Sequence, residues 1–382
     1  MLFSLGRRLR DGWPRRRHDS PRRPRALPLA GGLNCLEERL LLAGGTSPAA
    51  GQSAHVLTVA GQRGLSGLQE GVGATTSPGA TRASVLRSSG RSRGAIHHRH
   101  AAGKSGTIDA TIYRNITYTV LGGQAEQLNV YVPKGAPPPG GWPVIMAIHG
   151  GGWRSQDNLD YGTRVASAMV PGGYVVIAPD YVLSAPGRPT WPLNFEDVQA
   201  AVRWTRINAG MFGINPNEVV AMGESAGANL ANLLGTSSPL AASTPGVSAA
   251  VAAVVSFSSP TDLPALYQQS PQAGKAVAQF LGGPPWALPA SYASASPVDQ
   301  VAPNDPPVFL VHGARDPLVP VSQSEEMAAA LTNAGVRNQL VIIRGGGHNL
   351  DFPNRTPPNL VFQILEFLST TWKDRGSHSL KS

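Results

Sequence analysis

Cysteine is almost absent from this chain of 382 residues, which contains only Cys35. A single cysteine excludes an intramolecular disulfide and any metal site built from several thiolates. Neither the compartment nor the redox state follows from one cysteine. Because 41% of the residues are hydrophobic, the chain can still bury a core, so composition permits a globular enzyme.

Long hydrophobic runs are absent as well. No stretch approaches the roughly 18 to 20 consecutive apolar residues that a membrane-spanning helix needs, so we predict no transmembrane segment.

Acidic residues are scarce only in the N-terminal part of the chain. Residues 1–105 contain 17 Lys and Arg against 5 Asp and Glu, whereas residues 106–382 contain 15 against 18. The overall net charge of +9 therefore comes from the first part. Nucleic-acid binding needs basic residues on the folded surface itself, so we expect no nucleic-acid partner.

Residues 1–105 are rich in Arg, Gly, Ser and Pro, and we expect a mostly disordered leader there. A leucine-rich patch after Cys35 resembles leader segments of exported bacterial proteins, but its apolar run is shorter than that of an ordinary signal peptide. Export and a cytoplasmic location both stay open. The cluster of His97, His98 and His100 is more consistent with a solvated linker than with a metal site.

From residue 106 onward, short apolar runs alternate with helical patterns, which is typical of a mostly parallel sheet with helices on both faces. We predict a single α/β domain over residues 106–382. Its expected strands are 115–120, 127–132, 143–148, 174–178, 219–222, 252–257, 307–311 and 339–343. Its expected helices are 161–169, 194–208, 226–234, 322–334 and 359–372.

A candidate nucleophile lies between an expected strand and an expected helix. The segment 223–227 reads Gly-Glu-Ser-Ala-Gly and fits the G-x-S-x-G pattern around Ser225. A sharp turn from strand to helix needs small neighbours and exposes the serine hydroxyl above the sheet. The start of the helix also brings the amide of Ala226 and the positive end of the helix dipole near a developing oxyanion. The pattern alone is common by chance, so it needs partners.

A glycine-rich loop follows the expected strand 143–148. It reads His149-Gly150-Gly151-Gly152-Trp153. Glycines let a backbone turn its amides toward a negative charge at close range, so we predict that Gly151 and Gly152 complete an oxyanion hole with Ala226.

The acid and base of such a site must follow the serine in the order acid, then histidine. Asp316 follows the expected strand 307–311, and His348 follows the expected strand 339–343. The carboxyl ends of parallel strands share one edge of the sheet, where open α/β sheets build their sites. We therefore predict a triad of Ser225, Asp316 and His348, with His348 as base and Asp316 orienting it.

Other acids and histidines fit these roles less well. Asp305 precedes its strand and so lies at the wrong edge of the sheet, and Asp262 and Asp299 would need a loop that folds back. We expect Asp351 to make a local hydrogen bond rather than to serve as the triad acid. We expect His149 to support the glycine loop and His312 to support the triad.

With these motifs, residues 112–370 resemble the esterase and lipase branch of the α/β-hydrolases. The resemblance is closest to the bacterial feruloyl esterase-like group (BD-FAE), with hormone-sensitive-lipase-like and kynurenine formamidase relatives. It extends to residues 128–133, 180–184, 195–204 and 280–283. It implies an α/β-hydrolase fold and hydrolysis of carboxylic esters without a metal or organic cofactor, acting on short-acyl, carbohydrate or aromatic-acid esters.

No helical cap of the kind found in capped lipases precedes the glycine loop, so we expect a small cap or none. We predict pocket walls from Trp153, Tyr181, Trp191 and an insert between Thr261 and Pro297. Two rival functions remain: an arylformamidase-type amidase and a non-catalytic binding protein with the same fold. The sequence does not fix the natural substrate or the oligomeric state.

Overall fold

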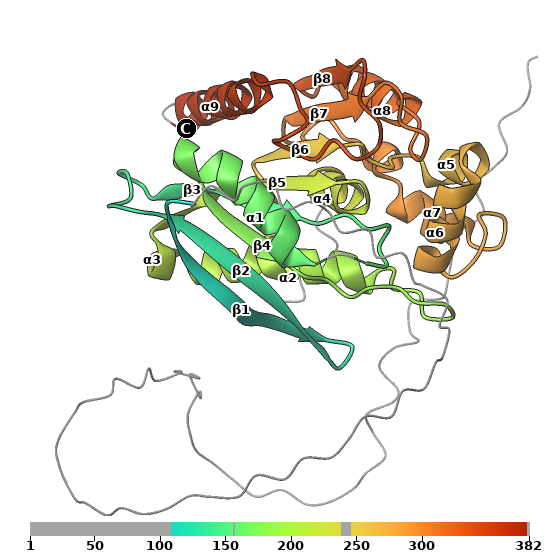
Figure 1. The fold of residues 1–382 in the computed structure, drawn as a ribbon, viewed down its shortest axis with the longest axis horizontal. Helices are drawn as coiled ribbons and strands as arrows, with labels where there is room; N and C mark the ends of the chain where they lie inside the picture. The colour runs from blue at the N-terminus through green and yellow to red at the C-terminus, as the bar shows by residue number, and fades with distance from the viewer. Residues whose placement is uncertain (1–107, 156, 238–245, 380–382) are drawn as a thin grey trace, which may run out of the picture. The chain divides into compact units, whose positions relative to one another are not determined.

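The computed structural model describes residues 108–155, 157–237 and 246–379. They contain one eight-stranded sheet in the order β1-β2-β4-β3-β5-β6-β7-β8 (Figure 1). The pairs β1–β2 and β2–β4 are antiparallel, and the other neighbours are parallel. The strands are β1 (Ala110–Leu121), β2 (Gln124–Pro133), β3 (Trp142–Ile148), β4 (Val175–Pro179), β5 (Ile214–Glu224), β6 (Ala253–Phe257), β7 (Val308–Gly313) and β8 (Asn338–Ile343).

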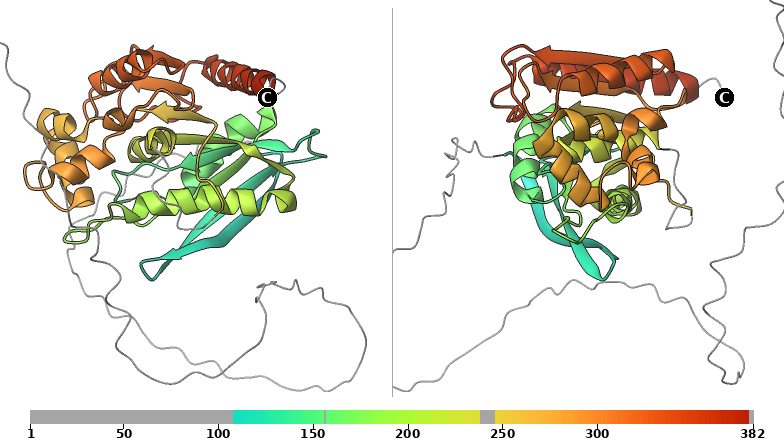
Figure 2. Two further views of the ribbon diagram at one scale, coloured as in Figure 1. Left: turned by 180° about the vertical axis from the view of Figure 1, so that it is seen from behind. Right: turned by 90° about the vertical axis from the view of Figure 1, so that its right-hand side faces the viewer.

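Helices cover both faces of this sheet. They are α1 (Asn158–Met169), η1 (Val170–Gly172), α2 (Leu193–Ile207), α3 (Ala209–Phe212), α4 (Ala226–Thr236), α5 (Leu263–Gln269), α6 (Pro271–Leu281), α7 (Pro289–Ala295), η2 (Pro297–Gln300), α8 (Ser322–Asn333) and α9 (Leu360–Ser379). Seen from behind, α2 lies in front of the sheet, whereas α1 lies on the other side (Figure 2).

The two faces form two hydrophobic cores, and the strands supply alternate side chains to each. In β3, Val144, Met146 and Ile148 pack with α2 and α4, while Ile145 and Ala147 pack with α1 and α9. Successive side chains of a strand point to opposite faces, so a strand that is covered on both sides is apolar along its whole length. This explains the apolar runs of β3, β4, β6 and β7 and of the second half of β5.

All eight expected strands and all five expected helices are present, with end points that differ by up to five residues in the strands and seven in the helices. Besides the short 3-10 helices η1 and η2, the helices not predicted individually are α3 and α5 to α7. The last three form the insert between β6 and β7, which lies at the carboxyl edge of the parallel strands (Figure 1).

The basic leader, the patch after Cys35 and the cluster of His97, His98 and His100 all lie outside the described residues. None of the described helices is long and apolar enough to cross a membrane.

Candidate active site

The turn from β5 to α4 holds Ser225 in an unusual backbone conformation. Its φ is 55° and its ψ is −119°, and non-glycine residues rarely adopt a positive φ. The neighbouring glycines have no room for a side chain. A Cβ on Gly223 would lie 2.2 Å from the Gly227 carbonyl oxygen, and a Cβ on Gly227 would lie 2.1 Å from the Ile148 carbonyl oxygen. The sequence pattern therefore reflects a backbone turn that only small residues permit.

The loop after β8 brings His348 to this turn. Its Nε2 lies 2.9 Å from Ser225 Oγ, and its Nδ1 lies 2.7 Å from Asp316 Oδ2. Because the ionised carboxylate can only accept, Nδ1 carries the proton, and Nε2 is left to accept from the serine hydroxyl. The three residues predicted as a triad are thus in hydrogen-bond contact, although they come from three loops far apart in the chain.

Asp316 is fully buried and well supplied with donors. Its Oδ1 accepts from the amides of Leu318 and Val319, at 2.8 and 2.9 Å. Burial by itself would raise the pKa of Asp316, but hydrogen bonds from His312 and His348 hold that pKa well below its usual range. The carboxylate is therefore charged at neutral pH and can stabilise an imidazolium on His348.

His312 supports Asp316 from behind, as expected. Its Nδ1 lies 2.6 Å from Ser324 Oγ, its Nε2 lies 2.9 Å from the Val319 carbonyl oxygen, and the same Nε2 lies 3.3 Å from Asp316 Oδ2. A carbonyl oxygen only accepts, so Nε2 carries a proton and donates it to Val319, while Nδ1 shares a hydrogen bond with the Ser324 hydroxyl. Through these contacts the ring holds the loop from Asp316 to Val319 in place.

The glycine-rich loop passes beside the start of α4. Gly151 has a φ of 90°, and a Cβ there would lie 2.0 Å from the Ser155 carbonyl oxygen. Among the residues that the structure describes, neither the Gly151 nor the Gly152 amide has a hydrogen-bond acceptor. The amide of Ala226 is the first of α4, where an intrahelical acceptor is missing. Three backbone donors thus remain for an anion at this place.

His149 supports this loop from inside. It is fully buried and stacks on Tyr181 with 4.2 Å between ring centroids. The Tyr181 hydroxyl donates to the carbonyl oxygens of His149 and Gly150. Burial lowers the pKa of His149 to about 4, so its ring is neutral and takes no part in proton transfer at neutral pH.

A cavity of about 290 Å³ opens above Ser225 and His348. Trp153 lines it from the glycine loop, and Leu266, Ala273 and Ala276 line it from the insert. Arg154 and Glu224 are the Arg and Glu side chains that line it. The insert thus forms one wall of the cavity, as predicted, and acts as a small cap.

Two of the three aromatic residues predicted for the pocket lie elsewhere. Tyr181 is 1% exposed and stacks beneath the glycine loop. Trp191 packs against Phe195 and Phe280, and its Nε1 donates to Ser294 Oγ. Neither lines the cavity above Ser225. Both lie between β4 and α2, but they pack against segments whose positions the sequence does not predict.

Sequence reasoning missed an ionic group beside the nucleophile. Glu224, directly before Ser225, pairs with Arg164 of α1 at 3.4 Å. Arg164 also lies 3.6 Å from Asp351, three residues after His348. The only sequence signal was an acidic residue at the second position of the G-x-S-x-G pattern, and nothing local identified its partner.

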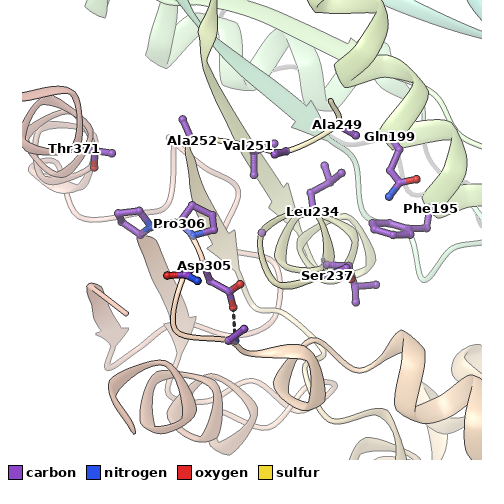
Figure 3. Close-up of a pocket in the computed structure, with 16 residues that line it drawn as sticks. Phe195, Gln199, Leu234, Ser237, Ala249, Val251, Ala252, Asp305, Pro306 and Thr371 are labelled. Carbon is purple, nitrogen blue, oxygen red and sulfur yellow. Dashed lines mark hydrogen bonds between the residues drawn. The ribbon is translucent and has the colours of Figure 1, made fainter. Parts of the chain in front are cut away.

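A larger cavity of about 490 Å³ lies elsewhere in the described structure, lined by α4 residues such as Leu234 and by the segment before β7 (Figure 3). Asp305 borders it and accepts from the Ala302 amide at 2.8 Å. No candidate triad residue lines this cavity. Asp305 therefore lies away from Ser225, as the sequence order indicated.

No group of three or more His, Cys, Asp and Glu side chains in the described part of the chain is arranged to hold a metal ion.

The family model described as BD-FAE matches residues 128–331. The chain is 30% identical over 218 residues to Esterase LipQ of Mycobacterium tuberculosis, covering 56% of this chain and 51% of that protein. It is 28% identical over 248 residues to Esterase LipC of the same organism, covering 61% and 60%. The chain thus spans about half to three fifths of these curated relatives.

Among solved structures, a carbohydrate esterase from gut microbiota superposes with a TM-score of 0.60 at 21% identity, covering 70% of this chain and 98% of that one. This likeness identifies the fold as that of the α/β-hydrolases. The family match spans more than half of the 382 residues, and the chain belongs to the BD-FAE family.

Proposed function

We propose that this protein is a serine hydrolase that cleaves carboxylic esters through an acyl-enzyme on Ser225. One observation carries the proposal. Ser225 Oγ lies 2.9 Å from Nε2 of His348, and Nδ1 of the same ring is hydrogen-bonded to the buried carboxylate of Asp316. Ser225 also lines a cavity. This combination activates a hydroxyl and leaves space for a substrate beside it.

In the first half of the reaction, Ser225 Oγ attacks the ester carbonyl carbon and its proton passes to His348 Nε2. The carbonyl oxygen becomes an oxyanion, which the amides of Gly151, Gly152 and Ala226 stabilise. When the carbon–oxygen bond to the alcohol breaks, His348 returns the proton to the leaving oxygen. The products of this half are the free alcohol and an acyl-Ser225 ester.

In the second half, water replaces the alcohol. His348 takes a proton from the water molecule, and the oxygen attacks the acyl carbon. The carboxylic acid leaves, and Ser225 recovers its proton from His348. Throughout both halves, Asp316 keeps the proton of the neutral ring on Nδ1 and stabilises the imidazolium when it forms.

The size of the cavity favours a substrate with a short acyl group. Its volume of about 290 Å³ must hold the acyl part together with some of the alcohol part, and Trp153 and the insert close it on two sides. The curated relatives are named as esterases, which favours ester over amide hydrolysis. We therefore propose short-acyl esters, including those of carbohydrates or aromatic acids, as substrates of a catalytic domain over residues 106–382.

The test is hydrolysis of p-nitrophenyl acetate, butyrate and octanoate by the full chain, beside Ser225→Ala. Ser237→Ala is the matched control, since Ser237 follows the other end of α4. We expect turnover that decreases with chain length, disappears in Ser225→Ala and persists in Ser237→Ala. No turnover of any ester by a folded protein would contradict the proposal and direct the search to formamides, then to a binding role.

A further inference from the structure

Arg164 on α1 lies among three carboxylates. Its guanidinium is 3.4 Å from Asp160, 3.4 Å from Glu224 and 3.6 Å from Asp351. The side chain is only 18% exposed, and the guanidinium carbon lies 5.2 Å from the centre of the Tyr161 ring. A cation that is taken out of water needs such partners, and the planar guanidinium can reach several at once.

Two of these partners belong to the candidate active site. Glu224 is the residue before Ser225 and lines the same cavity. Asp351 lies in the loop that carries His348 and has a φ of 45°, a strained conformation for a residue other than glycine. Arg164 therefore connects the turn that holds the nucleophile with the loop that holds the base, from a helix that supplies neither.

The third partner is different. Asp160 lies four residues before Arg164 on the same helix, and its side chain is 83% exposed. Exposed pairs of this kind contribute little to stability. Asp351 also has a second cation, Arg355, which lies 3.7 Å away and is 75% exposed. The exposed pairs Asp160–Arg164 and Arg355–Asp351 each share one residue with the buried pairs. Substitutions of Asp160 and Arg355 therefore provide matched controls.

Arg164 also acts on the site through its charge. Burial raises the pKa of Glu224, and Arg164 and then His348 act against that rise, while Asp351 adds to it. Without Arg164, the buried carboxyl of Glu224 would take up a proton rather than stay charged and unpaired. The imidazolium of His348 would then lose a nearby negative charge.

We propose that Arg164 is a positioning residue of this site: by joining Glu224 to Asp351 it holds His348 against Ser225 and keeps a negative charge beside the imidazolium. This inference rests on the proposed function of Ser225 and His348. Arg164 itself contacts neither of them, so its contribution passes through the two carboxylates.

The experiment compares Arg164→Met and Arg164→Lys with the controls Asp160→Asn and Arg355→Gln, all in the full chain. Four quantities are measured: kcat and KM on p-nitrophenyl acetate, the rate of labelling by a fluorophosphonate probe, and the midpoint of thermal unfolding. The probe reacts with an activated serine and needs no knowledge of the natural substrate.

For Arg164→Met we expect a fall of about 10- to 100-fold in both kcat and the labelling rate, since a small displacement of catalytic groups has effects of that size. KM should stay within about twofold, because the change affects the reacting groups and not ground-state binding. Arg164→Lys should recover part of the loss, since it keeps the charge but cannot reach both carboxylates. Both controls should retain the activity of the unchanged protein.

The pH profile separates positioning from a purely structural role. In Arg164→Met the acidic limb of kcat/KM should move to lower pH, because a neutral Glu224 no longer favours the protonated form of His348. Glu224→Gln should move that limb in the same direction, and combining the two substitutions should add little. The groups facing Glu224 are Arg164, Tyr161, His348 and Asp351. Those facing Arg164 are Asp160, Tyr161, Glu224 and Asp351, and His348 faces Asp316 and Glu224.

Three results would overturn the inference. One is a folded Arg164→Met protein with unchanged kcat and labelling rate. Another is a loss of activity that only follows a loss of thermal stability, with the pH profile unmoved. The third is an equal loss in both controls. If the unchanged protein is neither active nor labelled, the proposed function itself fails, which is a distinguishable outcome.

Discussion

Replacing Gly227 with alanine should damage both the fold and the candidate active site, because the added methyl group has no space. Its carbon would lie 2.1 Å from the Ile148 carbonyl oxygen and 2.3 Å from that of His149. Both atoms belong to backbone, so no side chain can rotate away. To reach an ordinary contact, the start of α4 and the glycine-rich loop must separate by about 1 Å.

Gly227→Ala should lower the free energy of unfolding by about 3 kcal/mol. This is the upper end of what overpacking usually costs, since two backbone segments must move. With an unfolding entropy of about 2.1 cal/mol/K per residue, that corresponds to a fall in Tm of roughly 5 °C for a domain of about 270 residues. The separation also spoils an oxyanion site shared between the two segments, so kcat should fall by about 100-fold.

The matched control is Gly210→Ala in α3, where an added Cβ meets nothing within 4 Å. The same substitution there should raise stability by up to about 1 kcal/mol, because alanine restricts the unfolded chain. Thermal unfolding and turnover of p-nitrophenyl acetate are measured for both variants. Equal Tm and kcat values in the two variants would refute the account of the turn.

Three further predictions concern charge. Asp316→Asn should lower kcat by about 10⁴-fold with the protein still folded, because an amide cannot hold the proton of His348 on Nδ1; activity within tenfold of the unchanged protein would contradict this. Burial, and then the charge of Asp197, raise the pKa of Glu126 to about 7. The folded state therefore holds a proton that the unfolded state releases near pH 4.3. As a result, the free energy of unfolding falls as the pH rises between these two values. Glu126→Gln should therefore raise Tm at pH 8 but not at pH 4, and an equal change at both pH values would argue against the buried carboxyl. Arg154 lines the cavity and has no ion-pair partner among the described residues, so Arg154→Gln should lower kcat/KM about fivefold for an ester with a carboxylate on its acyl chain. A neutral ester of equal length is the comparison, and an equal fall for both would assign Arg154 to the oxyanion instead.

The sequence predicted the strands and the three candidate triad residues because their signals are local. Each parallel strand is a short apolar run, and each candidate follows one, so the parallel topology alone brings Ser225, Asp316 and His348 to one edge. The G-x-S-x-G pattern also predicted the need for small residues at positions 223 and 227, because the turn has no space for a side chain there.

What escaped prediction depends on contacts between distant segments. Tyr181 and Trp191 follow β4 near the expected site, but their rings turn to His149 and Phe280. Arg164 is 60 residues from Glu224 in the chain, and a charged residue on a helix is ordinarily read as solvent-exposed. Only the packing of α1 against the sheet reveals that it faces the candidate site.

The role of Ser225 as nucleophile is tested most directly by labelling the full-length protein with a fluorophosphonate, digesting it and locating the label by mass spectrometry. We expect one phosphonylated residue, Ser225, with ester hydrolysis lost in proportion to labelling and no label on Ser225→Ala. Label on another serine, or ester hydrolysis that continues in Ser225→Ala, would contradict it.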